Sequence, residues 1–452
     1  MTDRTVPPVS GPIRPYEFPP VSRKRLENGL EVCVVPTTSL PIVTAMVVLP
    51  GGETAVPAQQ AGLAVLSGDA LEGGTERLTS RELAGALEGV GASFGAATGW
   101  DSTTVAVACQ ADVLADAMPL LAQMVHSPTF EKSEFDRYRA QRLASAARRR
   151  MNPSAIAADA HARHVFSEGD TYSRPLGGTE DSVGTLEASD ARRFVAARYG
   201  PASAAVVLVG DLDTAEAGAL ADRELGGWTR DAGAVPSPSA SPRLRERAVH
   251  LVHRPGSVQS QIRVGHVGVP RAVDDYFPLI VLNLILGGSF SSRLNLNLRE
   301  RHGFTYGVRS AFAPRRGPGP FSVSTAVENA VTGAAIAEIF TEIEDLVNGG
   351  PTSEEVETAT SYLAGVFPLR METTGQIASR IAEMFVYGLP EDYYRSYRDR
   401  VREVTCEDAA LAGQSHIRPA ELCAVVVGDA DAVAPQLEAL EIGPVTVHRA
   451  GR

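Results

Sequence analysis

The chain has few cysteines for its length, and they do not have the spacing of a metal site. Its 452 residues include four cysteines, Cys33, Cys109, Cys406 and Cys423, and no two of them form a Cys-x-x-Cys pair. Three lie in short apolar runs that are typical of strands, where a reduced cysteine packs as a small hydrophobic side chain. We therefore expect neither a cysteine-based metal centre nor a disulfide framework.

Long apolar runs are also missing from the sequence. No stretch of about 18 apolar residues occurs, so we expect no membrane-spanning helix and no membrane partner. The first 21 residues contain an acid and several prolines but no apolar core segment, which is unlike a secretory signal peptide. We predict an extended N-terminal arm over residues 1–21 and a cytoplasmic location.

Positive charge is in deficit, and lysine is scarce while alanine and glycine are abundant, as in proteins from GC-rich bacterial genomes. The 54 acidic residues outnumber the 42 basic ones, which gives a formal net charge of -12. This balance argues against nucleic acid as a partner and is compatible with basic peptides, although it can also serve solubility alone. The local run Arg148–Arg150 is interpreted as a solvated helix face.

Common nucleotide-binding and catalytic motifs are absent. The glycines of residues 89–95 have the wrong spacing for a dinucleotide site, and those of residues 287–293 are not followed by the lysine of a phosphate loop. No serine nucleophile motif or Cys–His pair stands out. His161 and His164 are one helical turn apart and could share a metal, but no carboxylate or cysteine stands at ligand spacing beside them. We interpret them as a solvated or packed pair.

The order of predicted strands and helices recurs, which indicates an internal duplication. The phrases VVLVGDLD and AVVVGDAD lie 218 residues apart and place Gly210 and Gly428 in equivalent positions. A Pro/Ser-rich segment, residues 229–247, separates the two halves and is predicted to be a linker that acts as a hinge. We predict an α+β fold with two homologous domains, residues 22–228 and 248–452, each a mostly antiparallel sheet packed with helices.

Two short signals support this interpretation of the first half. Asn28-Gly29 supplies a positive-φ turn between two strand-like runs and predicts a hairpin. Thr79 or Ser80, followed by Glu82, predicts the capped start of a helix.

The segment LRERHGFTY has the strongest pattern in the second half. It places Arg299 near the end of a helix that restarts after a Gly-Gly break, and Gly303 fits a left-handed C-cap. The following FTYGV is strand-like and places Tyr306 at a strand start. A guanidinium and a phenol on adjacent elements can hydrogen-bond a peptide carbonyl or a developing oxyanion. The alternative is that Arg299 pairs with Glu300 or solvent and Tyr306 belongs to the core.

The longer segment LNLNLRERHGFTYGV resembles the arginine–tyrosine segment in the C-terminal half of the insulinase, pitrilysin and mitochondrial-processing-peptidase family of zinc peptidases. The stretch YSRPLGGTEDSVGTLEASDARRFVAARYGPASAAVVLVGD resembles the end of that family's first half, and the resemblance covers residues 22–432. It implies a duplicated metallopeptidase-like fold. It also implies that Arg299 and Tyr306 reach across to the zinc site of another half and hold substrate there.

The zinc motif of that family has no intact counterpart in this chain. Catalytic members carry an inverted His-x-x-Glu-His on a helix, in which the histidines bind zinc and the glutamate is the general base. Counting back from Thr75 places Val65 and Asp69 at the histidine positions and Gly68 at the glutamate position. Counting back from Pro153 places the third ligand near Ser145. Valine and glycine cannot ligate a metal, and Asp69 alone cannot hold zinc. We expect this chain to bind no zinc.

The resemblance therefore implies the non-zinc-binding subunit of a heterodimeric zinc metallopeptidase, inactive alone. A partner subunit of the same family would carry the zinc, and a closed chamber would favour unfolded peptide substrates. Arg299 would hold a substrate carbonyl and Tyr306 would donate to the oxyanion. The alternatives are a catalytically inert scaffold or peptide-binding protein on the same fold, and an enzyme with chemistry of its own. A second copy of this chain, as the partner, would supply no zinc site.

Overall fold

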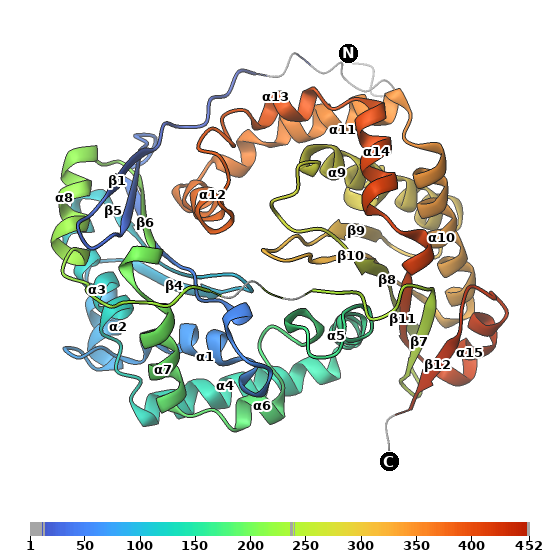
Figure 1. The fold of residues 1–452 in the computed structure, drawn as a ribbon, viewed down its shortest axis with the longest axis horizontal. Helices are drawn as coiled ribbons and strands as arrows, with labels where there is room; N and C mark the ends of the chain where they lie inside the picture. Colours follow the sequence, from blue (N-terminus) through green and yellow to red (C-terminus); the bar gives the residue numbers. More distant parts are fainter. Residues whose placement is uncertain (1–10, 12–13, 236–237, 239, 450–452) are drawn as a thin grey trace, which may run out of the picture.

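The chain folds into two halves, each built on one six-stranded sheet (Figure 1). The computed structural model describes residues 11, 14–235, 238 and 240–449. Most of the predicted N-terminal arm, residues 1–10 and 12–13, therefore lies outside the described residues, as do three positions of the predicted linker.

The first sheet has the order β1-β2-β6-β3-β5-β4, and the second has the order β12-β7-β11-β8-β10-β9. The strands of the first half are β1 (Ser22–Arg25), β2 (Glu31–Pro36), β3 (Ile42–Leu49), β4 (Ser93–Thr98), β5 (Thr103–Gln110) and β6 (Ala205–Gly210). Those of the second half are β7 (Ala248–His253), β8 (Gln259–Val267), β9 (Val308–Phe312), β10 (Pro320–Glu328), β11 (Cys423–Gly428) and β12 (Val445–His448). Most pairs are antiparallel, which confirms the predicted fold class.

The duplication is visible in the strand order. β6 is parallel to β2 and antiparallel to β3, and β11 is parallel to β7 and antiparallel to β8. Gly210 and Gly428 end these two equivalent strands. The halves differ at one edge, where β1 precedes its neighbour in sequence and pairs with it antiparallel, whereas β12 is the last strand and pairs in parallel.

Helices cover both sheets. Those of the first half are α1 (Leu63–Asp69), α2 (Ser80–Gly89), α3 (Leu114–His126), α4 (Lys132–Met151), α5 (Pro153–Val165), α6 (Glu180–Gly184), α7 (Ala188–Arg198) and α8 (Thr214–Leu225). Those of the second half are α9 (Tyr276–Asn283), α10 (Thr332–Gly349), α11 (Ser353–Val366), α12 (Thr374–Tyr387), α13 (Tyr397–Arg402), α14 (Cys406–His416) and α15 (Ala430–Glu438). The local predictions hold: Thr79 and Glu82 form a capping box on α2, and Gly29 adopts φ +88° in the β1–β2 hairpin.

The two halves exchange one helix each. α5 leaves the first half and packs on β8 and β11 of the second sheet, while α12 of the second half packs on β3 and β6 of the first (Figure 1). Thr44 on β3 and Thr374 at the start of α12 share a hydrogen bond of 2.8 Å between their hydroxyls. A hinge motion at residues 229–247 would therefore have to pull both helices from apolar faces that they cover.

Polar contacts add to this exchange. The buried carboxylate of Asp101 accepts hydrogen bonds from the backbone N–H of Arg316 at 2.9 Å and from the hydroxyl of Tyr387 at 3.1 Å. The guanidinium of Arg315 lies 4.3 Å from the ring centres of both Trp100 and Tyr172. The two halves thus form an interlocked pair.

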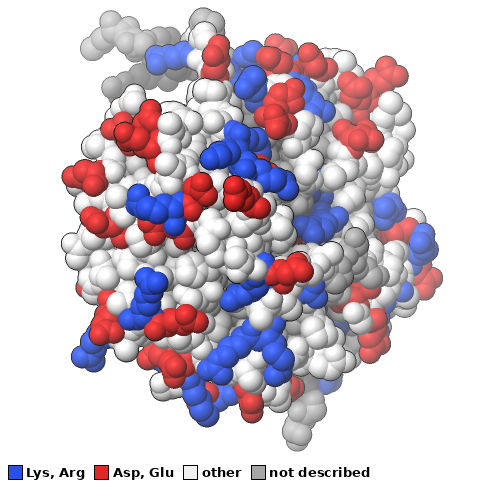
Figure 2. Space-filling model, turned by 60° about the vertical axis from the view of Figure 1, so that its left-hand side comes forward, with Lys and Arg blue, Asp and Glu red and all other residues white. Residues whose placement is uncertain are grey.

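The cysteines, the surface charges and the lengths of the helices can be compared with what the sequence predicts. All four cysteines are free, and Cys33, Cys109 and Cys423 are buried in β2, β5 and β11, which confirms the interpretation of their sequence runs. Acidic and basic side chains are intermixed over the face drawn in Figure 2. In the described part of the chain, no helix is both long enough and apolar enough to cross a bilayer.

Candidate functional site

The helix that carries Arg299 has widened turns. α9 continues into a π-helical turn, Leu284–Gly288, and the chain breaks after Gly288 as predicted. The next helix ends in a second π-helical stretch, Asn295–Arg301, instead of the regular helix expected from the sequence. π-Helical turns are rare and occur often at functional sites. Gly303 has φ +65° and donates its N–H to the Arg299 carbonyl at 3.1 Å, which confirms the left-handed C-cap.

Tyr306 does not lie on a strand, and it is not a core residue. β9 begins only at Val308, and Tyr306 stands in the preceding turn with its side chain 97% exposed. The strand starts late because the Thr305 hydroxyl accepts the N–H of Gly307 and closes a local turn. The Thr325 hydroxyl, on β10, donates to Thr305 at 2.9 Å and fixes this turn to the sheet. The backbone at Tyr306 is thus held while its phenol is free.

A buried amide joins the two parts of the segment. The Nδ2 group of Asn295 donates to the carbonyls of Ser289 at 3.0 Å and Val308 at 2.9 Å, and its Oδ1 accepts the N–H of Val308 at 3.1 Å. These bonds fix the beginning of the helical stretch that carries Arg299 relative to the start of β9. Sequence reasoning missed Asn295, and the only signal was the alternation of asparagines with leucines over residues 294–298.

Arg299 is held by an aromatic ring. Its guanidinium carbon lies 4.2 Å from the ring centre of Phe290, and its Nε is 3.6 Å from the nearest carboxylate oxygen of Glu300. The side chain is 32% exposed, so the alternative pairing with Glu300 and solvent describes it in part, and such a surface pair contributes little. A stacked guanidinium keeps its in-plane N–H groups available. Arg299 can therefore still donate to a carbonyl or carboxylate.

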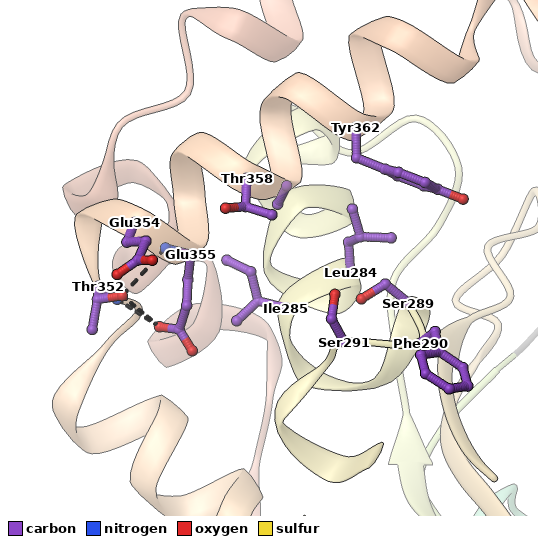
Figure 3. A pocket seen from close by; sticks show the side chains of 11 residues that line it. Leu284, Ile285, Ser289, Phe290, Ser291, Thr352, Glu354, Glu355, Thr358 and Tyr362 are labelled. Carbon is purple, nitrogen blue, oxygen red and sulfur yellow. Dashed lines mark hydrogen bonds between the residues drawn. The ribbon is translucent and has the colours of Figure 1, made fainter. Parts of the chain in front are cut away.

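A pocket of about 410 Å³ is lined in part by Phe290, the ring on which Arg299 stacks (Figure 3). It lies between the widened turn after α9 and the first turns of α11. Its lining comprises Leu284, Ile285, Ser289, Phe290, Ser291, Thr352, Glu354, Glu355, Thr358, Ala359 and Tyr362. Phe290 and Tyr362 are largely exposed at this pocket, and exposed apolar groups beside a cavity are typical of interaction sites.

The positions equivalent to the zinc motif lie together in the first half. Val65 and Gly68 are buried within α1, and Asp69 ends that helix. Asp69 and Ser145, the latter on α4, line one pocket of about 290 Å³. The structure therefore brings Asp69 and Ser145, which are far apart in sequence, to the same pocket.

The residues of this second pocket do not fit a zinc ion. The carboxylate of Asp69 is already paired with the guanidinium of Arg142, which lies one turn before Ser145 on α4. No histidine or cysteine is among the described residues that line the pocket. A Cβ atom at Gly68 would lie 2.2 Å from the Thr98 hydroxyl oxygen, so a glutamate side chain would displace that threonine. The guanidinium of Arg142 thus lies beside Asp69 and Ser145, two of the positions that the sequence comparison assigns to the metal ligands.

A buried glutamate, which the sequence did not single out, holds the start of α1. Glu53 is fully buried, and its Oε1 accepts the N–H of Gly62 at 2.7 Å. Burial raises the pKa of Glu53 to about 8, and the Gly62 N–H and the nearby Arg174 offset only part of this effect. Its other oxygen, Oε2, has no hydrogen-bond partner in the described structure. Glu53 is thus a desolvated carboxyl at the N-terminal end of α1.

His161 and His164 are packed side chains on α5, as expected. His161 is buried, and burial together with the charge of Arg263 lowers its pKa to about 3. His164 does not face His161 but stacks on His250 of the second half, with ring centres 3.6 Å apart. The packed interpretation is therefore right, but the partner of His164 lies in the other half.

Comparison with known proteins identifies the family. Residues 32–180 match the model of the insulinase family, peptidase family M16, and residues 185–363 match the model of the peptidase M16 inactive domain. The chain belongs to peptidase family M16. An uncharacterized zinc protease of Streptomyces coelicolor is 25% identical over 318 residues, which is 69% of this chain and 68% of that protein.

Other M16 relatives include proteins that are described as inactive. The non-peptidase homolog YmxG of Helicobacter pylori is 21% identical over 387 residues, 84% of this chain and 87% of that protein. The crystal structure of a peptidase M16 inactive domain from Pseudomonas fluorescens has a TM-score of 0.84 at 24% identity, covering 90% of this chain and 98% of that one. The structural likeness confirms the fold.

Proposed function

We propose that this M16 chain is the non-zinc-binding subunit of a two-chain zinc metallopeptidase that cleaves unfolded peptides. The partner supplies the zinc ion and the general base. This chain supplies Arg299, which holds a substrate carbonyl, and Tyr306, which donates its O–H to the oxyanion. Alone, the chain has no peptidase activity.

The observation that carries the proposal is the state of Tyr306. A tyrosine that is 97% exposed has no packing role, yet its backbone is fixed by the bonds of Thr305 and Thr325 and by the Asn295 amide. A fixed backbone with a free side chain reduces the entropy cost of placing a donor in another molecule's site. Arg299, stacked on Phe290, is presented in the same way.

The first half supports the division of labour. The Asp69–Arg142 pair and the filled space at Gly68 leave no zinc-binding set among the described residues of the pocket between α1 and α4. The match to the M16 inactive domain and the likeness to a non-peptidase homolog agree with a chain that does not cleave peptides by itself. The pocket beside Phe290 can accept an apolar side chain of an extended peptide.

The test is a reconstitution with an M16 chain from the same genome that has an intact His-x-x-Glu-His motif. Cleavage of a quenched, unstructured peptide is measured with zinc present for this chain, for the partner and for their mixture. We expect activity only in the mixture. Full activity of the partner alone, unchanged by this chain, would contradict the proposal and favour an inert scaffold or peptide-binding role.

A further inference from the structure

Three histidines from both halves meet away from the segment of Arg299 and Tyr306. His164 comes from α5, the helix that the first half lends to the second, whereas His250 lies on β7 and His448 on β12. One ring nitrogen from each of the three residues lies within 4.8 Å of the other two. Nδ1 of His250 and Nε2 of His448 are 3.1 Å apart.

We propose that His164, His250 and His448 bind one divalent transition-metal ion of the zinc, cobalt or nickel type. Three imidazoles and a water molecule complete a tetrahedral set, and imidazole nitrogen suits these borderline metals. The proposed roles of Arg299 and Tyr306 do not require this metal site, so each proposal can be tested independently of the other.

The distances are close to those of such a site. Two nitrogens that each lie about 2.0–2.1 Å from a tetrahedral zinc are about 3.4 Å apart. The pair formed by His250 and His448 already has nearly this separation. His164 stacks on His250 with an interplanar angle of 13°, so its ring must turn about χ2 to aim a nitrogen at the same point. That torsion is broad for histidine and costs little.

The electrostatic surroundings act in two directions. Burial lowers the pKa of His164 to about 3 and that of His250 to about 4, so these rings are neutral at pH 7 and their lone pairs can ligate. The charge of Arg243 also lowers both pKa values, that of Arg163 lowers the pKa of His164, and both charges oppose a bound cation. The proposed site therefore favours a strongly ligated transition metal over a hard cation such as Mg²⁺.

Binding here would tie the two halves together. α5 is held to the second sheet by apolar packing, and β12 is a short edge strand paired only with β7 in the described sheet. A metal bound by His164, His250 and His448 would join the exchanged helix, β7 and β12 at one point. Because only the folded chain places the three rings together, the metal should also raise the melting temperature.

A second group of potential ligands provides the matched control. Potential ligand atoms of His253, Asp429 and Asp431 also lie within 4.8 Å of one another, but each of the three side chains already has a hydrogen-bond or ion-pair partner. Asp429 accepts the N–H groups of Gly256 and Asp431, and the Nδ1 atom of His253 accepts the N–H of Ala430. Asp431 is paired with an arginine. This second group is therefore expected to remain empty.

The experiment titrates the EDTA-treated chain, without any partner, with Co²⁺ and follows the visible absorption of tetrahedral cobalt and the melting temperature. We expect about one bound ion per chain and a rise in melting temperature. His164→Ala, His250→Ala and His448→Ala should each weaken binding by at least about 10-fold, because even loss of a group that only orients a ligand costs about 10–100-fold. His253→Ala should bind as the parent chain does.

Each possible result decides the question. Absence of cobalt binding by the folded parent chain overturns the proposal, because the histidine contact is then only a hydrogen-bonded stack. Binding that survives His448→Ala but is lost in His253→Ala also overturns it and assigns the ion to the second group. His448 lies on a partly exposed edge strand, so its variant should fold even if substitution of His250 disturbs the sheet.

Discussion

Two regions of this M16 chain, the pocket between α1 and α4 and the segment of Arg299 and Tyr306, differ in how their polar groups are used. In the pocket of α1 and α4, Asp69 is paired with Arg142 inside the chain. In the second half, Arg299 and Tyr306 present their polar atoms outward on a backbone that the amide of Asn295 fixes. The charged groups of the first region are paired within the chain, whereas the second region exposes hydrogen-bond donors to solvent.

This difference lies in whether the polar groups find partners within the chain. Structural side chains satisfy their hydrogen bonds within the protein, because an unpaired polar group that is out of water is costly. Tyr306 gives nothing to the stability of this chain through its phenol, and Arg299 gives only a ring contact and a loose approach to Glu300. The Asp69–Arg142 pair is explained by the fold alone, whereas the proposed function would account for the outward donors of Arg299 and Tyr306.

The largest expected effect comes from the exposed pair. In the reconstituted enzyme, Tyr306→Phe should lower kcat by about 10²–10³-fold, because removal of one oxyanion donor typically has this cost. Arg299→Ala should mainly raise KM, because it removes a contact made to the bound substrate as well as to the transition state. The measurement is steady-state cleavage of the quenched peptide by the mixed subunits.

The control for this prediction is Tyr362→Phe, which removes a phenol oxygen from the neighbouring pocket and should leave kcat unchanged. Both tyrosine variants should melt with the parent chain, because neither hydroxyl is buried. A Tyr306→Phe enzyme with normal kcat would remove the functional contrast between the two regions, whatever its effect on KM.

Much of the fold follows from local signals in the sequence. The hairpin at Gly29, the capping box of Thr79, and the repeated strands that end at Gly210 and Gly428 each depend on neighbouring residues, and each is found as predicted. The left-handed conformation of Gly303 belongs to the same class. Such features are encoded within a few residues, so pattern reasoning can reach them.

The rest depends on contacts between distant segments. The exchange of α5 and α12 is invisible in sequence, because an apolar helix face does not specify which sheet it covers. Tyr306 was placed on a strand because FTYGV has strand propensity, but hydrogen bonds from Thr305 and Thr325 override it. Arg142 was missed because nothing local shows that it pairs with Asp69, 73 positions away.

A second prediction concerns Glu53, behind the motif helix. Its pKa of about 8 lies above the ordinary glutamate value of 4.5, so between these pH values the folded chain keeps a proton that the unfolded chain releases. Stability is therefore greatest below about pH 4.5 with respect to this group, and it falls as the pH rises towards 8. The loss should be about 2–4 kcal/mol. Urea unfolding, followed by the fluorescence of the buried Trp228, reports on this half.

Glu53→Gln should remove this pH dependence, because the amide stays neutral at every pH while keeping the shape of the side chain. Glu88→Gln, on the exposed face of α2, is the matched control and should keep the dependence of the parent chain. The urea midpoints of the parent chain and of Glu53→Gln are compared at pH 5 and pH 8. If the two midpoints change equally, Glu53 is ionised in the folded chain and its pKa is not raised.

The smallest effect is expected at the Asp69–Arg142 ion pair in the pocket between α1 and α4. Arg142→Ala should lower the free energy of unfolding by about 1 kcal/mol, since both partners are partly exposed and solvent screens their attraction. Arg150 lies on α4 like Arg142, is more exposed than Arg142 and pairs with Glu180 of α6. Arg150→Ala should therefore change the free energy of unfolding by less than about 0.5 kcal/mol. Arg142→Ala should also leave kcat of the mixed enzyme unchanged, because this pocket holds no reacting group under the proposed function. A loss of kcat comparable with that of Tyr306→Phe, at unchanged stability, would show that the internally satisfied region also takes part in the chemistry.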